Sequence, residues 1–296
     1  MNFSSLVGKF SRKTGILGGH KPDASGAPTM LDVLRFPYGP FRFKANLTKG
    51  NPYSVQASTD LRTWHVVADG TSGENFEYLD SDAAKFSHRF YRLLRGKIEA
   101  TNVIGYASVT LPPGFSMIAN PFESSSTISD FIRDWPDGTA LSRFDTRLFR
   151  LTENTLQFGK WTNPSERLHP GEGAIFFNPT SDYKSLSFFG EVMQGNLSVP
   201  IPSGFSVRSS LVPQPGHLVD DLAFPIADGD VIHIFDREAQ RYILYPYENG
   251  KWTSGAPVLG VAEAFWVAKT DPGNWRRHFS AVPEEPPAPP AGSHLA

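Results

Sequence analysis

Short runs in which apolar and polar residues alternate occur in the first third of the chain. Residues 53–58 read Tyr-Ser-Val-Gln-Ala-Ser, and residues 76–80 read Phe-Glu-Tyr-Leu-Asp. Alternation with a period of two is typical of β-strands that bury one face. Glycine, asparagine and proline separate the runs, as at residues 49–52, and these residues favour turns. The pattern predicts a small β-sandwich domain over residues 31–97.

The remainder of the chain contains one pattern twice. The tripeptide Gly-Phe-Ser at residues 114–116 recurs at 204–206, and Gly-Lys-Trp-Thr at 159–162 recurs at 250–253. Further matched residues follow in the same order at an offset of 90 or 91 positions. Ordered self-similarity of this kind indicates a duplication. We therefore expect an all-β fold in which residues 102–192 (copy one) and 193–282 (copy two) are tandem copies of a mostly-β module of about 90 residues.

One short helix is predicted within copy one. Thr127-Ile128-Ser129-Asp130 has the form of a capping box, and two further apolar residues follow it. A capping box satisfies the first free N–H groups of a helix. Residues 217–224 occupy the same place in copy two.

The two ends of the chain differ from the folded blocks in composition. Residues 1–30 include Lys9, Arg12, Lys13 and Lys21 with no acidic residue before Asp23. The apolar stretches of this segment are too short for the core of a signal peptide. We expect a flexible basic arm, or alternatively a segment that docks on a neighbouring subunit. Residues 283–296 begin with Pro-Glu-Glu-Pro-Pro-Ala-Pro-Pro, which favours an extended polyproline tail or linker.

Composition and charge limit the classes of function. The 296 residues carry a formal net charge of -2 and no cysteine. The absence of cysteine excludes disulfides, thiolate metal sites and cysteine nucleophiles. General electrostatic attraction to nucleic acid requires a basic face, which this composition does not favour. No apolar run is long enough for a membrane span. We therefore expect neither nucleic acid nor a membrane span among its interactions.

The sequence lacks the residue patterns of an enzyme. The histidines are not spaced as zinc ligands, and there is no phosphate-binding loop or nucleophile elbow. The acids that recur in both copies (Asp137 with Asp228, Asp145 with Asp236, and Glu172 with Glu263) are interpreted as residues that serve the fold, as turn acids or as acceptors for backbone N–H groups. The aspartates at 220, 221, 228 and 230 leave calcium open, although their spacing matches no known calcium loop. The prediction is a non-enzymatic protein with no catalytic residue, metal or cofactor.

Residues that differ between the copies are the better candidates for binding. Trp161 and Trp252 are equivalent, which indicates a role in the core. Trp275, Arg276, Arg277, Tyr245 and Tyr247 have no such counterparts and are therefore the candidate binding residues. Exposed tryptophan and tyrosine side chains can stack against sugars, so a carbohydrate-binding protein that uses these residues is the alternative to a structural role. A packed aromatic side chain is the competing interpretation of each.

Three segments of the first block carry a family resemblance. Residues 58–64 (Ser-Thr-Asp-Leu-Arg-Thr-Trp), 76–80 and 89–93 (Arg-Phe-Tyr-Arg-Leu) resemble a fibronectin type III-like β-sandwich module of large bacterial secreted and surface proteins. The duplicated blocks are similar to modules that follow it in such proteins. The resemblance implies a subunit or appendage of a bacterial surface or extracellular assembly. Its expected partners are other protein subunits or further copies of itself, with glycans as the alternative, and its expected location is extracellular or at the cell surface.

Overall fold

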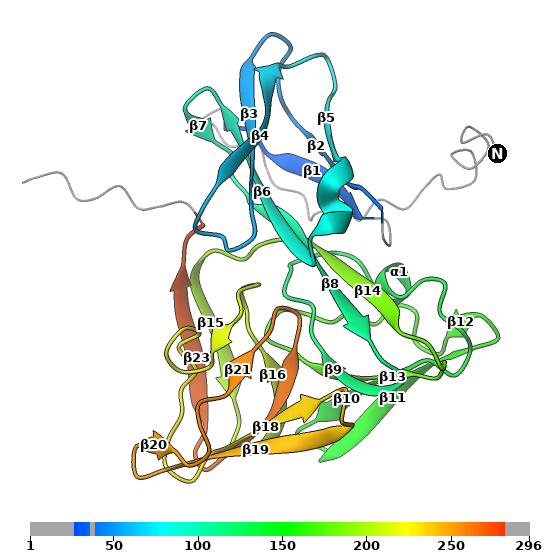
Figure 1. Cartoon of the computed structure of the whole chain (residues 1–296), viewed down its shortest axis with the longest axis vertical. Coiled ribbons are helices and arrows are strands. Elements are labelled where there is room, and N and C mark those ends of the chain that lie inside the picture. Colours follow the sequence, from blue (N-terminus) through cyan, green and yellow to red (C-terminus); the bar gives the residue numbers. More distant parts are fainter. Residues whose placement is uncertain (1–26, 36–38, 282–296) are drawn as a thin grey trace, which may run out of the picture.

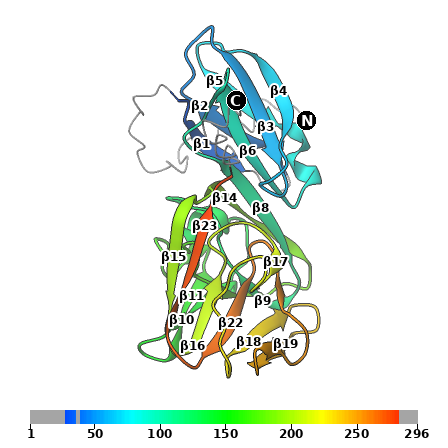
Figure 2. The ribbon, with the colours of Figure 1, turned by 90° about the vertical axis from the view of Figure 1, so that its left-hand side faces the viewer.

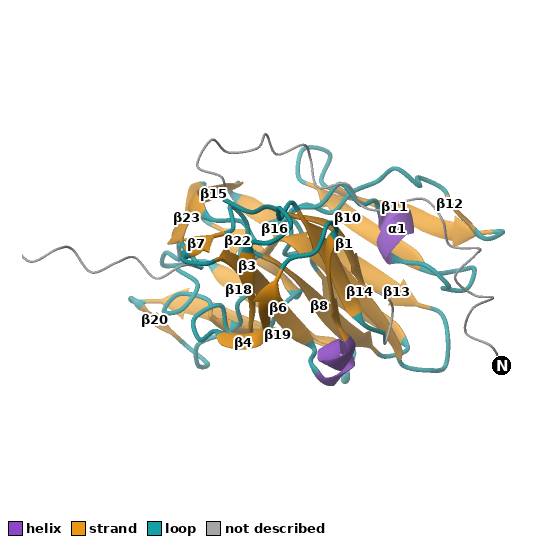
Figure 3. Cartoon of the chain, turned by 90° about the horizontal axis from the view of Figure 1, so that it is seen from above, coloured by secondary structure: helices purple, strands orange, loops and turns teal. Residues whose placement is uncertain are grey.

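The computed structural model describes residues 27–35 and 39–281. The predicted polyproline tail at 283–296 and nearly all of the basic arm lie outside these residues. Within the described part, helix is limited to α1 (Ile128–Phe131) and a short 3-10 turn at Ser81–Lys85, and antiparallel strands form the rest of the regular structure (Figure 3). The prediction of an all-β fold is confirmed.

The first block is a sandwich of two sheets. A three-stranded sheet has the order β1-β2-β5, and it packs against β3, β4 and β6. Phe41 stacks on Tyr91 between the two sheets, with ring centroids 4.7 Å apart. The strands of this block are β1 (Met30–Arg35), β2 (Phe41–Ala45), β3 (Pro52–Ser58), β4 (His65–Thr71), β5 (Phe76–Asp80), β6 (His88–Arg95) and β7 (Ile98–Glu99).

Copy one and copy two contain sheets with the same strand order. The order is β9-β13-β10-β11-β12 in copy one and β16-β22-β18-β19-β20 in copy two, so each strand has a counterpart at the same place. Each copy also has a pair formed by its first and last strands, β8 with β14 and β15 with β23.

The strands of copy one are β8 (Ile104–Leu111), β9 (Gly114–Ile118), β10 (Ala140–Asp145), β11 (Arg150–Gln157), β12 (Lys160–Trp161), β13 (Ala174–Asn178) and β14 (Lys184–Glu191). Those of copy two are β15 (Gly195–Ile201), β16 (Gly204–Ser209), β17 (Gly216–His217), β18 (Val231–Asp236), β19 (Arg241–Glu248), β20 (Lys251–Trp252), β21 (Val258–Leu259), β22 (Ala264–Lys269) and β23 (Gly273–Phe279).

The first block and copy one share one continuous sheet, with the order β14-β8-β6-β3-β4. Figure 2 shows β8 entering the first block above the two copies. The close pairing of β6 with β8 depends on Gly105, because a Cβ atom there would lie 2.6 Å from Phe90 Cδ1 and 2.7 Å from Arg89 O. The first block also contacts the end of copy two, where Trp64 Nε1 donates to Ala281 O at 3.2 Å. The three blocks therefore form one connected body (Figure 1).

The helix predicted in copy one is present, and the structure of its counterpart is different. Thr127 N–H donates to Asp130 Oδ2 at 3.0 Å at the start of α1, as the capping box predicts. In copy two the same place holds β17 and a series of turns. The reciprocal arrangement persists there, because His217 N–H donates to Asp221 Oδ2 at 2.8 Å. The side chain–backbone contact is thus kept while the helix is not.

Candidate functional site

The aspartates that recur in both copies hold the hairpin turns. Asp145 Oδ1 accepts hydrogen bonds from the N–H groups two and three residues further on, at 2.8 and 3.1 Å. Asp236 Oδ1 does the same at 3.1 and 3.0 Å. Asp137 and Asp228 each accept a hydrogen bond from the glycine N–H of the following hairpin, at 2.8 Å in both copies. The interpretation of these aspartates as turn acids or acceptors for backbone N–H groups is confirmed.

The two copies meet along a seam with approximate twofold symmetry. Ala119 N–H donates to Ala262 O at 2.9 Å, and the equivalent Ser209 N–H donates to Gly171 O at 3.3 Å. In addition, Ile118 forms a bridge with Glu263, as its counterpart Arg208 does with Glu172. Equivalent residues thus exchange partners across the seam, as in an isologous interface between two subunits.

Each seam glutamate is held in its own copy. Glu172 Oε2 accepts from His169 N–H at 3.1 Å, and Glu263 Oε2 accepts from Gly260 N–H at 2.8 Å. The other oxygen of each carboxylate binds an arginine, which is Arg143 at 2.8 Å for Glu172 and Arg237 for Glu263. These contacts give both glutamates a structural role in the seam.

Beside the seam, side chains from both copies form one continuous apolar surface, which we name the aromatic surface. Phe144 of β10 packs against Trp266 of β22, with ring centroids 4.8 Å apart. Phe149, in the turn between β10 and β11, lies 5.3 Å from Phe144 and 6.5 Å from Phe205 of β16. Trp266 Nε1 donates to the Tyr242 hydroxyl at 3.1 Å. The aromatic surface consists of Phe144, Phe149, Leu151, Phe205, His233, Phe235, Tyr242, Leu244 and Trp266.

Strand alternation explains why these side chains share one face. Phe235 pairs with Tyr242 and His233 pairs with Leu244 across β18 and β19, so all four point to the same side of the sheet. Part of that side is buried in the seam, where it carries small residues such as Ala264. The rest remains open, with Phe149 66% and Leu244 50% exposed. A contiguous exposed apolar area of this kind is a mark of an interaction site.

Trp275 lies in the core of copy two. Its side chain is 1% exposed, and its ring packs edge-on against Phe224 with centroids 5.0 Å apart. Its Nε1 donates to Leu222 O at 2.7 Å. The expectation that Trp275 is an exposed binding residue is therefore wrong. The residue belongs to β23 (Gly273–Phe279), whose alternation turns positions 275 and 279 inward.

The two predicted tyrosines lie on the inner side of β19. Tyr245 packs against the copy-two core, and Tyr247 contacts Trp252 edge-on at 5.1 Å. Both are half-buried. The strand carries Tyr242 and Leu244 on the opposite, outer side. The structure thus separates Tyr245 and Tyr247 from the aromatic surface. Tyr245 and Trp275 belong to the same core cluster of copy two, although their strands lie in different sheets.

The two predicted arginines have different environments. Arg276 is exposed and lines a shallow hollow of about 370 Å³ on the outside of β15 and β23. Arg277 is half-buried and donates to Gln214, whose amide donates to Asp60 O of the first block at 3.0 Å. Burial lowers the pKa of Arg277, as does the neighbouring Arg62. Gln214 therefore joins copy two to the first block, and Arg277 holds the Gln214 side chain.

The sequence-based selection missed Phe149, Phe205 and Tyr242. The signal that could have found Phe149 is its place in a turn, since Leu148 and Phe149 lie in a hairpin connection where polar residues are usual. Phe205 has a counterpart, Phe115, and is therefore not among the residues that differ between the copies. That counterpart is also exposed, so a matched position is not proof of burial.

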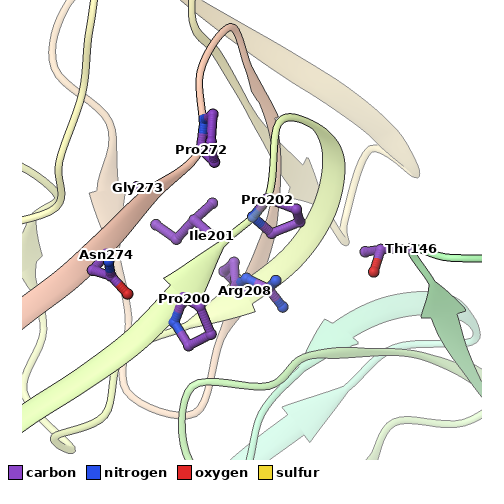
Figure 4. Close-up of a pocket in the computed structure, with 8 residues that line it drawn as sticks. All are labelled: Thr146, Pro200, Ile201, Pro202, Arg208, Pro272, Gly273 and Asn274. Carbon is purple, nitrogen blue, oxygen red and sulfur yellow. The ribbon is translucent and has the colours of Figure 1, made fainter.

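A pocket opens on the other side of the seam, around Arg208 of β16 (Figure 4). Its volume is about 520 Å³, which lies in the range of small-molecule and side-chain binding sites. Figure 4 shows Arg208 between Pro200 and Pro202, with Thr146 of copy one facing it. Pro272, together with Gly273 and Asn274 at the start of β23, closes the remaining side.

The clustered aspartates of copy two do not form a calcium site. Both oxygens of Asp230 are engaged, one by Lys269 and Ala227 N–H and the other by Thr270. Asp221 accepts the His217 N–H group of its own turn, and Asp228 accepts the Gly250 N–H group of the hairpin between β19 and β20. Over residues 27–35 and 39–281, no three histidine, aspartate or glutamate side chains converge on a possible metal position.

Within the same residues, no helix combines the length and apolar character needed to cross a membrane. Comparison of the chain with protein-family models, curated proteins and solved structures finds no match.

Proposed function

We propose that this chain is a non-enzymatic structural subunit that associates with other protein subunits, including further copies of itself, through the aromatic surface. The observation that carries the proposal is the composition of that surface. It brings together exposed phenylalanine, tyrosine and leucine side chains from both copies in one continuous area. Interface centres are enriched in aromatic residues and depleted in charge.

The roles of the recurring carboxylates also support a structural function. A hydrolytic or acid–base site needs carboxylates that face a substrate. The aspartates of the turns and the glutamates of the seam instead accept backbone N–H groups of their own copies. Their hydrogen bonds therefore serve the fold.

We infer the setting of this function from the sequence resemblance of the first block. Its motifs at residues 58–64, 76–80 and 89–93 are similar to those of fibronectin type III-like modules in bacterial secreted and surface proteins. On that basis the subunit belongs to a bacterial surface or extracellular assembly. The duplication of one β module would give the assembly a subunit with two related but unequal halves.

A double substitution tests the proposed association, using residues that the other copy carries at the same positions. Phe149→Gln installs the counterpart of Gln240, and Leu244→Glu installs the counterpart of Glu153. We expect the full-length double variant to self-associate at least about tenfold more weakly than wild type, because two central apolar contacts are lost. Sedimentation velocity over a concentration series measures this.

Phe158→Asn is the matched control. Phe158 is 93% exposed and lies at the far end of β11 from Phe149, outside the aromatic surface. The control should associate like wild type. A wild-type chain that remains monomeric at high concentration, or a double variant that associates as strongly as wild type, would overturn the proposal.

The alternative is a carbohydrate-binding protein. Because Trp275 is buried, sugar binding would depend on Tyr242, the exposed ring that is hydrogen-bonded to Trp266. A glycan array distinguishes the two functions. Binding of a sugar that is lost in Tyr242→Ala, without any change in association, would favour the alternative.

A further inference from the structure

The pocket around Arg208 lies at a seam position where the two copies carry different residues. Ile118 and Arg208 are equivalent, as their bridges to Glu263 and Glu172 show. Ile118 is 1% exposed and belongs to the hydrophobic core. Arg208 instead extends its guanidinium group into the pocket. The fold therefore does not require a cation at this position.

Among the residues that the structure describes, no carboxylate forms an ion pair with the guanidinium group of Arg208. Its Nη1 donates to the adjacent Val207 O at 3.1 Å, while its Nε is buried and has no acceptor among the described residues. The carboxylate that acts on it at longer range is Glu172, which already binds Arg143 at 2.8 Å. Burial lowers the pKa of Arg208. A buried donor without an acceptor is costly, and an arriving anion would relieve that cost.

The walls of the pocket specify what kind of anion fits. Pro200, Ile201, Pro202 and Pro272 form an apolar lining, and polar atoms come from Arg208, Thr146 and Asn274. An arginine fork matches a carboxylate with two parallel N–H···O bonds. The matching ligand is therefore a carboxylate on an apolar chain segment that can contain proline.

We propose that this pocket binds the segment 283–290 of a neighbouring copy of the chain, with Glu284 or Glu285 bound to Arg208. The segment reads Pro-Glu-Glu-Pro-Pro-Ala-Pro-Pro and lies outside the described residues. It supplies the two chemistries that complement the pocket, a carboxylate for Arg208 and prolines to pack on the apolar lining. Proline-rich segments lose little conformational entropy on binding, because the polyproline II form is their preferred state.

The position of Ala281 favours a neighbouring copy over the same chain. The pocket lies at the Gly273 end of β23, and Ala281 follows the opposite end of that strand, next to Trp64. Six residue steps along β23 span about 20 Å. The four residues from Ala281 to Glu285 extend at most about 14 Å. The glutamates of the same chain therefore fall short of the pocket.

This inference rests on the proposed function in one respect, since its partner is a second copy. The test measures the pocket directly. The receptor is the full-length chain with Glu284→Gln and Glu285→Gln, so that its own tails cannot compete. The probe is a fluorescein-labelled peptide of residues 281–291, and its anisotropy reports binding. We expect saturable binding that weakens at least about tenfold when both glutamates of the peptide are changed to glutamine.

Substitutions in the receptor locate the site. Arg208→Ile, which installs the residue of copy one, should weaken binding of the peptide by at least about tenfold. Arg167→Ile changes an exposed arginine outside the pocket and should leave binding unchanged. Arg208→Glu should bind a peptide in which both glutamates are replaced by arginine. This rescue separates a lost contact from a misfolded receptor, and thermal unfolding of each variant checks the fold.

The outcomes distinguish the two proposals. Equal binding to the Arg208→Ile receptor, or no binding at millimolar peptide, overturns the pocket inference even if the chain self-associates. Peptide binding by a wild-type chain that stays monomeric at high concentration would overturn both the neighbouring-copy assignment and the proposed self-association, and would leave a carboxylate pocket that serves another partner. Peptide binding together with weaker association of Glu284→Gln/Glu285→Gln supports the inference in full.

Discussion

Copy one and copy two contain sheets with the same strand order, but they carry different residue types at two equivalent buried positions. In copy one, Thr139 and Asn178 are neutral; Thr139 donates to Pro136 O at 2.8 Å, and Asn178 donates to backbone carbonyl groups. In copy two the equivalent residues are Asp230 and Lys269, which form an ion pair with side chains 0% and 5% exposed. The fold therefore requires hydrogen-bonded partners at these positions, whereas charge is optional.

The largest expected effect comes from breaking the buried pair of copy two. Lys269→Asn leaves Asp230 charged and buried, and Asp230→Thr leaves the ammonium group of Lys269 in the same state. We expect either single variant to lower the free energy of unfolding by about 3–5 kcal/mol, because an unpaired buried charge is not compensated. Urea unfolding followed by circular dichroism measures the change.

The double variant Asp230→Thr/Lys269→Asn carries the pair of copy one. It should be less destabilised than either single variant, since no charge remains to be compensated. If the double variant loses the sum of the two single effects, the positions are not interchangeable between the copies. The conclusion that charge is optional would then be wrong.

The all-β fold was predictable because it depends on patterns that are local in sequence. Alternating runs and turn residues mark the strands of the first block, such as β3 and β5, and the strand β9 carries the repeated Gly-Phe-Ser. The shared sheet of the first block and copy one was not predictable. It is set by the pairing of β6 with β8. The sequence feature that this pairing requires is the glycine at position 105, where the two strands are in tight contact.

The interaction surface was harder to predict than the fold. The copy comparison correctly identified Asp145 and Asp236 as turn residues, because each contacts its own turn. It failed for Trp275, which lacks a matched counterpart yet is buried. Alignment of two copies reports whether a residue is shared, whereas exposure depends on which face of a strand it occupies and on what covers that face.

The next largest effect tests the packing of the seam. Gly173 and Ala264 are equivalent, and a Cβ atom on Gly173 would lie 2.5 Å from the Cβ of Ala264 and 2.6 Å from Val207 Cγ1. The seam therefore has room for one methyl group at this point. We expect Gly173→Ala to lower the free energy of unfolding by about 1–3 kcal/mol through overpacking.

Ala264→Gly in the Gly173→Ala background moves the methyl group to the other copy and should restore part of the loss. Chemical denaturation of both variants and of Ala264→Gly alone completes the cycle. Equal stability of Gly173→Ala and wild type would mean that the seam is looser than these distances indicate.

A smaller effect is expected at the hairpin between β11 and β12. Phe158 has a φ of 51°, and its copy-two counterpart Asn249 has a φ of 52°. Asparagine tolerates this left-handed conformation better than phenylalanine does. Phe158→Asn should therefore stabilise the chain, and Asn249→Phe should destabilise it, each by no more than about 1 kcal/mol. Thermal unfolding measures both shifts, and shifts of the same sign would contradict the comparison.

The smallest expected effect is a pH dependence that only copy two can provide. His233 of the aromatic surface replaces Ser142 of copy one, and burial lowers its pKa below the ordinary value of 6.5. A lowered histidine pKa favours the neutral ring. The contribution of His233 to stability is therefore complete above the ordinary value of 6.5 and is lost as the pH falls through the folded pKa. The phenol of Tyr242 stays neutral in this range, since burial raises its pKa. A partner that covers the surface buries His233 further, and self-association should accordingly be a few-fold weaker at about pH 5 than at about pH 7.5. His233→Phe should reduce this difference when association is measured by sedimentation at both pH values, and an undiminished pH dependence in that variant would assign it to other groups.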